Sequence, residues 1–179
     1  MNRCKWCNEK NPLYVKYHDE EWGVLRTDDK YLYEMLILES FQAGLSWECV
    51  LNKREAFREA FDDFDINRIS NYGDTKIKEL CENPKIIRNK LKIKATVTNS
   101  KIFVDIVTEY GGFYNYICAF TKGETYREAN LTRSPLSDSI SADLTRRGMK
   151  LCGSVIIYAY LQAIGVINSH EDSCFLSEN

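Results

Sequence analysis

The stretch 32–47, LYEMLILESFQAGLSW, decides how the rest of the chain has to fold. It follows Thr27, Asp28 and Asp29, and this pattern predicts a helix start with a capping residue and negative charge in the first turn. Nearly every position as far as Ala43 is apolar, and a helix that is hydrophobic on most of its faces is a buried helix. The sequence therefore predicts a buried helix here.

One carboxylate lies inside this apolar helix. Glu39 shares its helical face with Leu32, Met35, Leu36 and Ala43. Gly44 can end the helix and Ser46 can cap the next one, which puts Trp47 at the turn between them. A buried carboxylate beside an aromatic ring indicates a functional site. A carboxylate that only bonds backbone groups or a neighbouring arginine would give the same pattern.

Composition predicts a single domain over residues 1–179. The chain has 179 residues, 44% of them hydrophobic, which is enough for a substantial core. No apolar run approaches the roughly 20 residues needed to span a bilayer, and the first residues, MNRCKWCNEKNP, contain no apolar signal core. We therefore expect a cytoplasmic protein without a membrane segment, whose seven cysteines are mostly reduced thiols.

Helical spacing recurs along the chain, and sustained period-two alternation does not, so the expected fold class is all-α. Residues 1–26 show no helical period, although they carry several large aromatic residues. A helix is expected over 46–61, followed by short helical turns capped by Asp65 and Asp74. Pro84 is expected to begin a long helix that Gly111 ends. A short apolar helix is expected over 113–120, and a loop over 121–136.

The last third of the chain contains a helix-hairpin-helix pattern over about 138–165. A helix ending at Gly148 is followed by GMKLCG (148–153) and by a second, apolar helix that Gly165 ends. Glycine lets backbone N–H groups approach an anion, and a helix start adds its positive dipole end. Gly148, Lys150 and Gly153 are therefore candidate contacts to a nucleic-acid backbone. An ordinary turn between two helices has the same pattern.

The net charge of −2 does not by itself indicate nucleic-acid binding, but a local basic patch can bind DNA. One candidate patch is KIIRNKLKIK (85–94), which has five basic residues and no acid. A second consists of Arg146, Arg147 and Lys150. Each patch, taken alone, is also typical of a solvated helix face.

Possible metal ligands gather near both ends of the chain. His170 and Cys174 have an H-x3-C spacing, and Cys4 and His18 would complete a Cys2His2 set suited to structural zinc. Such a site would fasten the two terminal segments together. Cys4-x2-Cys7 is itself a common zinc spacing, so five residues compete for four places. Free thiols and two surface histidines remain the alternative.

The chain as a whole resembles the constitutive bacterial DNA-3-methyladenine glycosylases of type I, in the helix-hairpin-helix DNA glycosylase superfamily. The resemblance runs from Arg3 to Cys174. Its most specific motifs are E-x4-GLSW, YHD-x2-WG and H-x3-C, and it is carried by RCKWC (3–7), PLYVKYHDEEWGV (12–24), YEMLILESFQAGLSWECVLNKREAFREAF (33–61), IIRNKLKI (86–93), RRGMKLCG (146–153) and IGVINSHEDSC (164–174).

The resemblance implies excision of N3-methyladenine, and less well of N3-methylguanine, from alkylated double-stranded DNA in base-excision repair. Free 3-methyladenine would be the product, and the enzyme would act as a monomer in the bacterial cytoplasm, at the nucleoid. The resemblance also implies one structural Zn²⁺ held by Cys4, His18, His170 and Cys174, without Cys7. The implied base pocket consists of Trp6, Tyr14, Tyr17, Trp22, Glu39 and Trp47.

These residue types suit the implied chemistry. N3-methylation makes the base cationic and weakens its glycosidic bond, and electron-rich rings favour a cationic base. We expect Glu39 to be the catalytic residue, through base recognition and electrostatic assistance. Many superfamily members use an Asp about twenty residues beyond the hairpin, but Asp172 lies within the implied metal site, so it is given no chemical role. No lysine stands out as a Schiff-base nucleophile, which predicts hydrolysis without strand cleavage.

Two hypotheses of other classes fit parts of the sequence. One is a protein that binds alkylated or distorted DNA without cleaving the glycosidic bond. The other is a small zinc domain whose aromatic residues bind an unrelated small molecule. The residue that would replace a flipped base in the helix stays open between Leu45, Gln42 and residues near Leu151.

Overall fold

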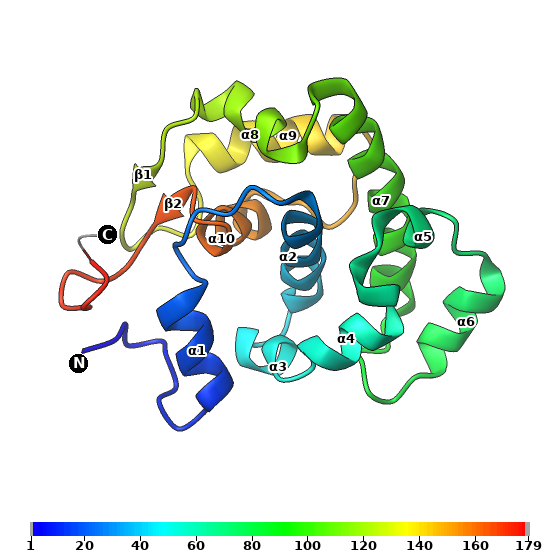
Figure 1. Ribbon diagram of the computed structural model, residues 1–179, viewed down its shortest axis with the longest axis horizontal. Coiled ribbons are helices and arrows are strands. Elements are labelled where there is room, and N and C mark those ends of the chain that lie inside the picture. Colours follow the sequence, from blue (N-terminus) through cyan, green and yellow to red (C-terminus); the bar gives the residue numbers. More distant parts are fainter. Residues whose placement is uncertain (1, 178–179) are drawn as a thin grey trace.

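The computed structural model describes residues 2–177, and its regular secondary structure is almost entirely helical, as expected. The elements in chain order are α1 (Pro12–Glu20), α2 (Asp29–Gln42), α3 (Trp47–Leu51), α4 (Arg54–Ala60), the 3-10 turn η1 (Asp62–Phe64), α5 (Ile66–Ser70), α6 (Asp74–Glu82), α7 (Lys90–Tyr110), α8 (Phe113–Thr121), β1 (Tyr126–Arg127), α9 (Pro135–Arg146), α10 (Ser154–Ala163) and β2 (Ile167–Asn168) (Figure 1). No helix within residues 2–177 is long and apolar enough to cross a membrane.

Helix α2 lies at the centre of the fold, and its burial is confirmed. All ten positions from Leu32 to Phe41 are buried, and α2 contacts α3, α7, α8 and α10 (Figure 1). Its N-cap is Asp28, whose side chain accepts a hydrogen bond from the Tyr31 amide, so Thr27 is not the cap. At the other end Lys92 donates to the carbonyls of Phe41 (2.8 Å) and Ala43 (2.5 Å), which places a cation at the negative end of the helix dipole.

Three expected boundaries are wrong, and in two of them a polar side chain caps the helix at another residue. Helix α1 lies within the segment that was expected to be irregular, and it begins where Asn11 caps Pro12. Residues 46–61 form two helices separated by Asn52 and Lys53. Pro84 starts no helix. Instead, α7 begins at Lys90, because the Asn89 side chain accepts from two amides of its first turn.

The two helices of the hairpin, α9 and α10, pack against each other. Ser134 and Ser137 form a capping box at the start of α9. The connecting loop is held against α7 by Asn99, whose side-chain amide donates to the Lys150 carbonyl (2.8 Å) and accepts from the Lys150 amide (2.8 Å). The conformation of the loop is therefore fixed by α7 as well as by its own glycines.

The two terminal segments of the described chain meet on one side of the molecule, where Figure 1 marks both ends. The Phe175 amide donates to the Asn2 carbonyl (2.9 Å). Nearby, β1 and β2 pair in parallel, with Tyr126 opposite Ile167. In this region residues 23–26 also pass over the end of α10. The backbone amide of Gly23 donates to the Gln162 carbonyl, and that of Arg26 donates to the Ile164 carbonyl.

Gly165 follows the end of α10 and lies against the backbone of residues 24–25. Its φ is +77°, and a Cβ built there would lie 2.2 Å from the Leu25 nitrogen. We therefore expect Gly165→Ala to lower the free energy of unfolding by about 2–5 kcal/mol, from left-handed backbone strain and overpacking. Urea denaturation measures this loss. Gly73→Ala is the control, because no atom lies within 4 Å of that position; equal stabilities of the two variants would contradict the prediction.

Candidate active site and metal centre

A cavity of about 200 Å³ lies between α1, α2, α3 and α10. All six residues that the sequence resemblance implied for a base pocket line it: Trp6, Tyr14, Tyr17, Trp22, Glu39 and Trp47. Three residues that were not predicted from the sequence complete the lining: Gln42, Ala159 and Gln162.

The three missed residues follow from helical spacing once the pairing of α2 with α10 is known. Gln42 lies three positions after Glu39, and Ala159 and Gln162 have the same spacing on α10. Gln42 was expected only as one candidate for a residue inserted into DNA. The sequence contains no signal that α10 packs beside α2, so α10 could not be assigned to the cavity beforehand.

Glu39 is the electrostatic centre of the cavity. Its side chain is 4% exposed, and burial raises the pKa of its carboxyl to about 8. Its Oε2 atom has no hydrogen-bond partner among residues 2–177, and the Nε1 atom of Trp47 is also buried without one. A buried acceptor and a buried donor left unpaired in one cavity are typical of a site whose hydrogen bonds are completed by a ligand.

Aromatic rings form the remaining walls. The Trp6 ring lies 4.7 Å from Trp22 and 5.3 Å from Tyr14, measured between centroids, and the Tyr17 ring lies 5.1 Å from Trp47. Burial raises the pKa of Tyr14 to about 12 and that of Tyr17 well above its usual value, so both phenols are neutral. The cavity therefore combines one carboxylate with flat, electron-rich walls, an arrangement that favours a planar cation.

The hairpin residues lie beside this cavity. A second hollow shares Glu39, Gln42 and Ala159 with it and is bordered by Leu45 and Val155, which are 42% and 57% exposed. These exposed apolar side chains stand on the turn after α2 and on the first turn of α10. The cavity thus opens between the α2–α3 turn and the start of α10.

The structure places the three predicted backbone-binding residues in and next to the loop between α9 and α10. Gly148 has a φ of +102°, Lys150 is exposed, and Gly153 is the exposed N-cap residue of α10. The neighbouring arginines are different, because Arg147 pairs with Glu109 (2.6 Å) and Asp143 (2.7 Å). Arg146 also pairs with Asp143. These two arginines are therefore neutralised within the protein and do not form a free basic patch.

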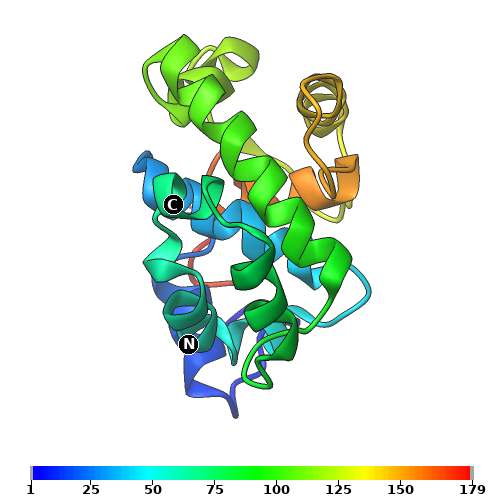
Figure 2. The ribbon, with the colours of Figure 1, turned by 90° about the vertical axis from the view of Figure 1, so that its right-hand side faces the viewer.

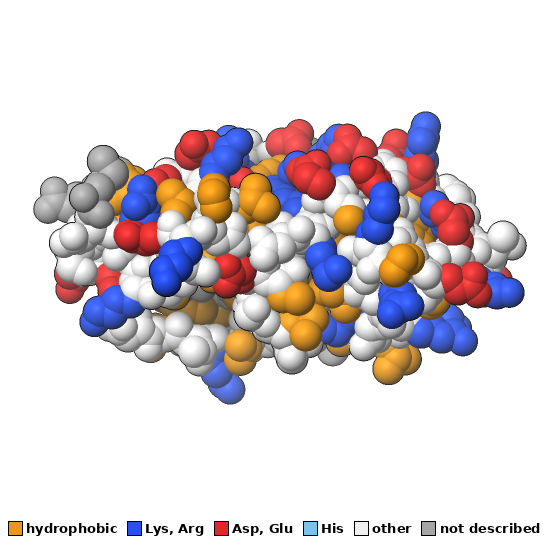
Figure 3. Space-filling model, turned by 90° about the horizontal axis from the view of Figure 1, so that it is seen from below, with side chains coloured by type: hydrophobic (Ala, Val, Ile, Leu, Met, Phe, Trp, Pro, Cys, Tyr) orange, Lys and Arg blue, Asp and Glu red, His pale blue; other side chains and the backbone are white. Residues whose placement is uncertain are grey.

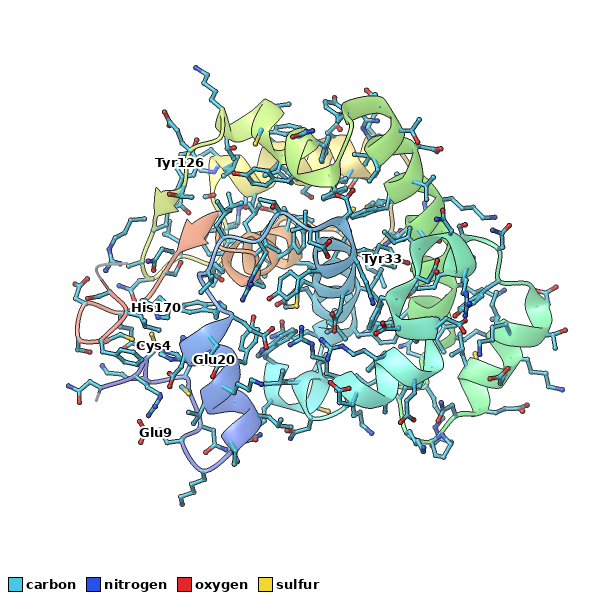
Figure 4. All side chains as sticks on the ribbon, in the orientation of Figure 1. Cys4, Glu9, Glu20, Tyr33, Tyr126 and His170 are labelled. Carbon is cyan, nitrogen blue, oxygen red and sulfur yellow. The ribbon has the colours of Figure 1, made fainter. Side chains whose placement is uncertain are left out.

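Four buried side chains, Cys4, His18, His170 and Cys174, bring their sulfur and nitrogen atoms within 4.8 Å of one another. Figure 4 labels Cys4 and His170 close together where the terminal segments meet. The Nδ1 atom of His170 lies 3.4 Å from the Cys4 sulfur and 3.5 Å from the Cys174 sulfur, and the His18 Nε2 atom lies 3.6 Å from the Cys174 sulfur. A tetrahedral zinc site has sulfur–nitrogen edges of about 3.5 Å, so the donor set fits.

Groups around the four side chains orient them as metal ligands. His18 Nδ1 lies 2.8 Å from Asp19, which also accepts from Arg3, and His170 Nε2 lies 3.2 Å from the Trp22 carbonyl. The other nitrogen of His170, Nδ1, thus faces the two cysteine sulfurs. The other nitrogen of His18, Nε2, faces the Cys174 sulfur and accepts from the Cys4 backbone amide at 3.2 Å. Backbone amides donate to both cysteine sulfurs, as they do to thiolates: Glu171 to Cys4 (3.4 Å) and Leu176 to Cys174 (3.5 Å).

Cys7 is buried but lies outside this group. Its thiol points to the Tyr14 carbonyl, 3.8 Å away. Burial raises the pKa of the Cys4 thiol to about 12 and lowers that of His170 to about 4. The His170 ring is thus neutral at pH 7, as a ligand must be, whereas the Cys4 proton would be displaced by a bound metal.

The raised pKa of Glu39 predicts a pH-dependent stability. Between its ordinary value near 4.5 and about 8, the unfolded chain loses the Glu39 proton while the folded protein keeps it, so the wild type loses stability as pH rises. Glu39→Gln removes this effect. We expect the variant to gain on the order of 2–4 kcal/mol over wild type between pH 5 and pH 9. Urea denaturation at both pH values tests this, and a gap that is independent of pH would contradict it.

A family model described as methyladenine glycosylase matches residues 6–177. The chain is 37% identical over 181 residues to DNA-3-methyladenine glycosylase 1 of Escherichia coli, covering 97% of this chain and 96% of that protein. It is 33% identical over 178 residues to DNA-3-methyladenine glycosylase of Haemophilus influenzae, covering 96% of each.

Solved structures agree with the sequence comparison. A crystal structure of 3-methyladenine DNA glycosylase I superposes with a TM-score of 0.93 at 37% identity, covering 98% of this chain and 99% of that one. The Staphylococcus aureus enzyme, solved to explain its recognition of 3-methyladenine, gives a TM-score of 0.91 at 31% identity, covering 97% and 95%. Together with the shared fold, these matches establish that the chain belongs to the methyladenine glycosylase family.

Proposed function

We propose that this protein hydrolyses the N-glycosidic bond of N3-methyladenine in alkylated double-stranded DNA and releases free 3-methyladenine. The observation that carries the proposal is the unpaired Glu39 carboxylate inside a cavity walled by aromatic rings. Relatives named for this activity match over nearly the whole chain, which supports it. A protein of this function works at the bacterial chromosome, so we place it in the cytoplasm, acting as a monomer.

The cavity provides what recognition of a cationic purine requires. N3-methyladenine carries a positive charge, which the faces of Trp6, Tyr17 and Trp47 favour. The folded protein without a ligand keeps the Glu39 proton up to a pH of about 8, and a cation in the cavity favours its loss, so that the bound base faces a carboxylate. The Glu39 oxygen without a partner accepts a hydrogen bond from the exocyclic amino group of adenine. Unmodified adenine is neutral and has a stronger glycosidic bond, so part of the selectivity comes from the substrate itself. A damaged, poorly paired base also costs less to flip.

N3-methylguanine should be the poorer substrate. Guanine has a carbonyl oxygen where adenine has its amino group, so an acceptor would face the acceptor Glu39. N3-methylguanine is also cationic, so we expect a weaker activity on it and not a complete loss.

The chemical step needs little from the protein. The methylated base is a good leaving group, and water attacks the sugar as the bond breaks. No lysine lines the cavity, so no Schiff base forms there and the DNA strand stays intact. Asp172 pairs with Arg127 and its side chain is 97% exposed, which supports giving it no role in the reaction. Gly148, Lys150 and Gly153 would hold a backbone phosphate near the cavity mouth.

The ion that best suits the Cys2His2 group is one structural Zn²⁺ per chain. Four protein ligands leave no position for a reacting water. The ligand histidines contact the cavity wall, because the His18 ring lies 5.2 Å from Trp6 and the His170 ring lies 4.6 Å from Trp22. The metal site therefore supports the cavity and takes no part in the reaction.

Release of 3-methyladenine from methylated duplex DNA tests the enzymatic proposal. We expect wild type to release the base and Glu39→Gln to do so about 10²-fold more slowly, because the carboxylate stabilises positive charge in the transition state. Glu124→Gln, which changes an exposed carboxylate, is the control and should keep full activity. A wild-type protein that binds methylated DNA and releases nothing would instead be a damage-binding protein.

Elemental analysis tests the metal. The purified protein should contain one equivalent of zinc, which Cys174→Ala loses and Cys7→Ala keeps. Removal of the metal should lower the melting temperature and leave the preference for N3-methyladenine over N3-methylguanine largely unchanged. Equal zinc loss in the two variants would show that the ligand assignment is wrong.

A further inference from the structure

We propose that Lys90, Lys94 and Lys101, one exposed face of α7, form a second DNA-backbone contact beside the hairpin. We call these three residues the α7 ridge. The inference rests on the proposed function, because it assumes that duplex DNA is the partner. It adds a contact surface that lies outside both the hairpin and the cavity.

The ridge is a regular feature of one helix face. Its lysines are separated by four and seven positions, so they lie in a row along α7, with Thr98 between the last two. All three lysines and Thr98 are exposed. From Lys90 to Lys101 the helix rises about 16 Å, which matches the path of several phosphates along one DNA strand.

The charges of the ridge are available to a partner. None of the three lysines forms an ion pair with any residue between 2 and 177. Other basic residues of the same sequence region are already engaged, since Lys85 pairs with Glu59 and Lys92 donates to the end of α2. Two acids accompany the ridge: Asp74 lies across a groove from Lys90 and Lys94, and Asp105 lies one turn beyond Lys101.

That groove increases the positive charge at one end of the ridge. It lies between α6 and α7 and is lined by Lys78, Lys90 and Lys94 together with the single acid Asp74. In Figure 3 acidic and basic side chains are interspersed over the upper part of the face, whereas its lower edge shows mainly basic and hydrophobic side chains. A row of three lysines joined by a fourth is therefore suited to a polyanion.

The ridge also belongs to the helix that holds the hairpin in place. The hairpin rests on the middle of α7, because Asn99 holds Lys150 and a Cβ on Gly148 would lie 3.5 Å from Ile102. The first turn of α7 reaches the cavity mouth, where Lys92 binds the Ala43 carbonyl. Figure 2 shows α7 crossing the front of the molecule with the hairpin beside it. Helical spacing puts Lys92 and Asn99 on the buried face of α7, opposite the ridge. A duplex that contacts both Lys150 and the ridge therefore has to lie across the exposed face of α7.

Binding to a duplex with a central tetrahydrofuran, an uncleavable abasic analogue, tests the ridge over a range of salt concentrations. The test variant is Lys94→Gln/Lys101→Gln, and Lys90→Gln/Lys94→Gln is a second one. The control is Lys10→Gln/Lys122→Gln, which removes the same charge from exposed positions on other parts of the surface. Thermal denaturation checks that each variant is folded.

Each lysine that neutralises a phosphate contributes about one to the slope of log affinity against log salt. We expect both ridge variants to reduce the slope by about two, so that between roughly 50 and 200 mM salt wild type loses about tenfold more affinity than they do. The control should keep the wild-type slope. Shortening the duplex on one flank of the lesion should remove the difference between wild type and the ridge variants.

Base release by the same preparations separates the two proposals. If wild type releases 3-methyladenine but the ridge and control variants have the same slope, the ridge proposal is overturned and the proposed function stands. If wild type neither releases the base nor binds the duplex, the proposed function fails, and the ridge proposal fails with it.

Discussion

The structure depends on burying one carboxyl group, that of Glu39, whose Oε2 atom has no hydrogen-bond partner among residues 2–177. Glu39 lies inside the most buried helix of the fold, and desolvation of its charged form is the reason that its pKa rises to about 8. A polar atom left unpaired in the interior costs on the order of 1–3 kcal/mol. Burial of the apolar residues of α2 on every side offsets that cost, so the same helix provides both the core and the site.

Rigid surroundings keep the cavity open around Glu39. Helix α2 is fixed at its start by Asp28 and at its end by Lys92, and its neighbour α10 is fixed to residues 23–26 at Gly165. The aromatic walls come from residues 6–22 and from Trp47, and their rings pack on one another. A base that enters thus meets preformed walls, and the binding energy is not spent on ordering them.

Sequence alone predicted the all-α class, the buried α2 and the hairpin, because glycine positions and helical spacing are local signals. The composition of the cavity came from resemblance: Trp6 and Tyr14 carry no local sign of their destination. Ala159 and Gln162 were missed because the pairing of α10 with α2 is a long-range contact. Helix boundaries failed where one side chain decided them, as Asn89 does for α7 and Asn11 for α1. The pairing of Arg147 with Glu109 is likewise invisible in a run of basic residues.

The metal group also imposes an order of assembly. Cys4 and His170 are 166 positions apart, so the group cannot form until the chain as far as residue 174 has been synthesised and has left the ribosome. Trp6 and Trp22 pack against the histidines of that group, which makes this wall of the cavity among the last parts of the molecule to be completed. A nascent or truncated chain that folds its central helices without residues 170–174 has an open, unsupported pocket. Competence to hold a base thus arises only after residue 174 has been synthesised.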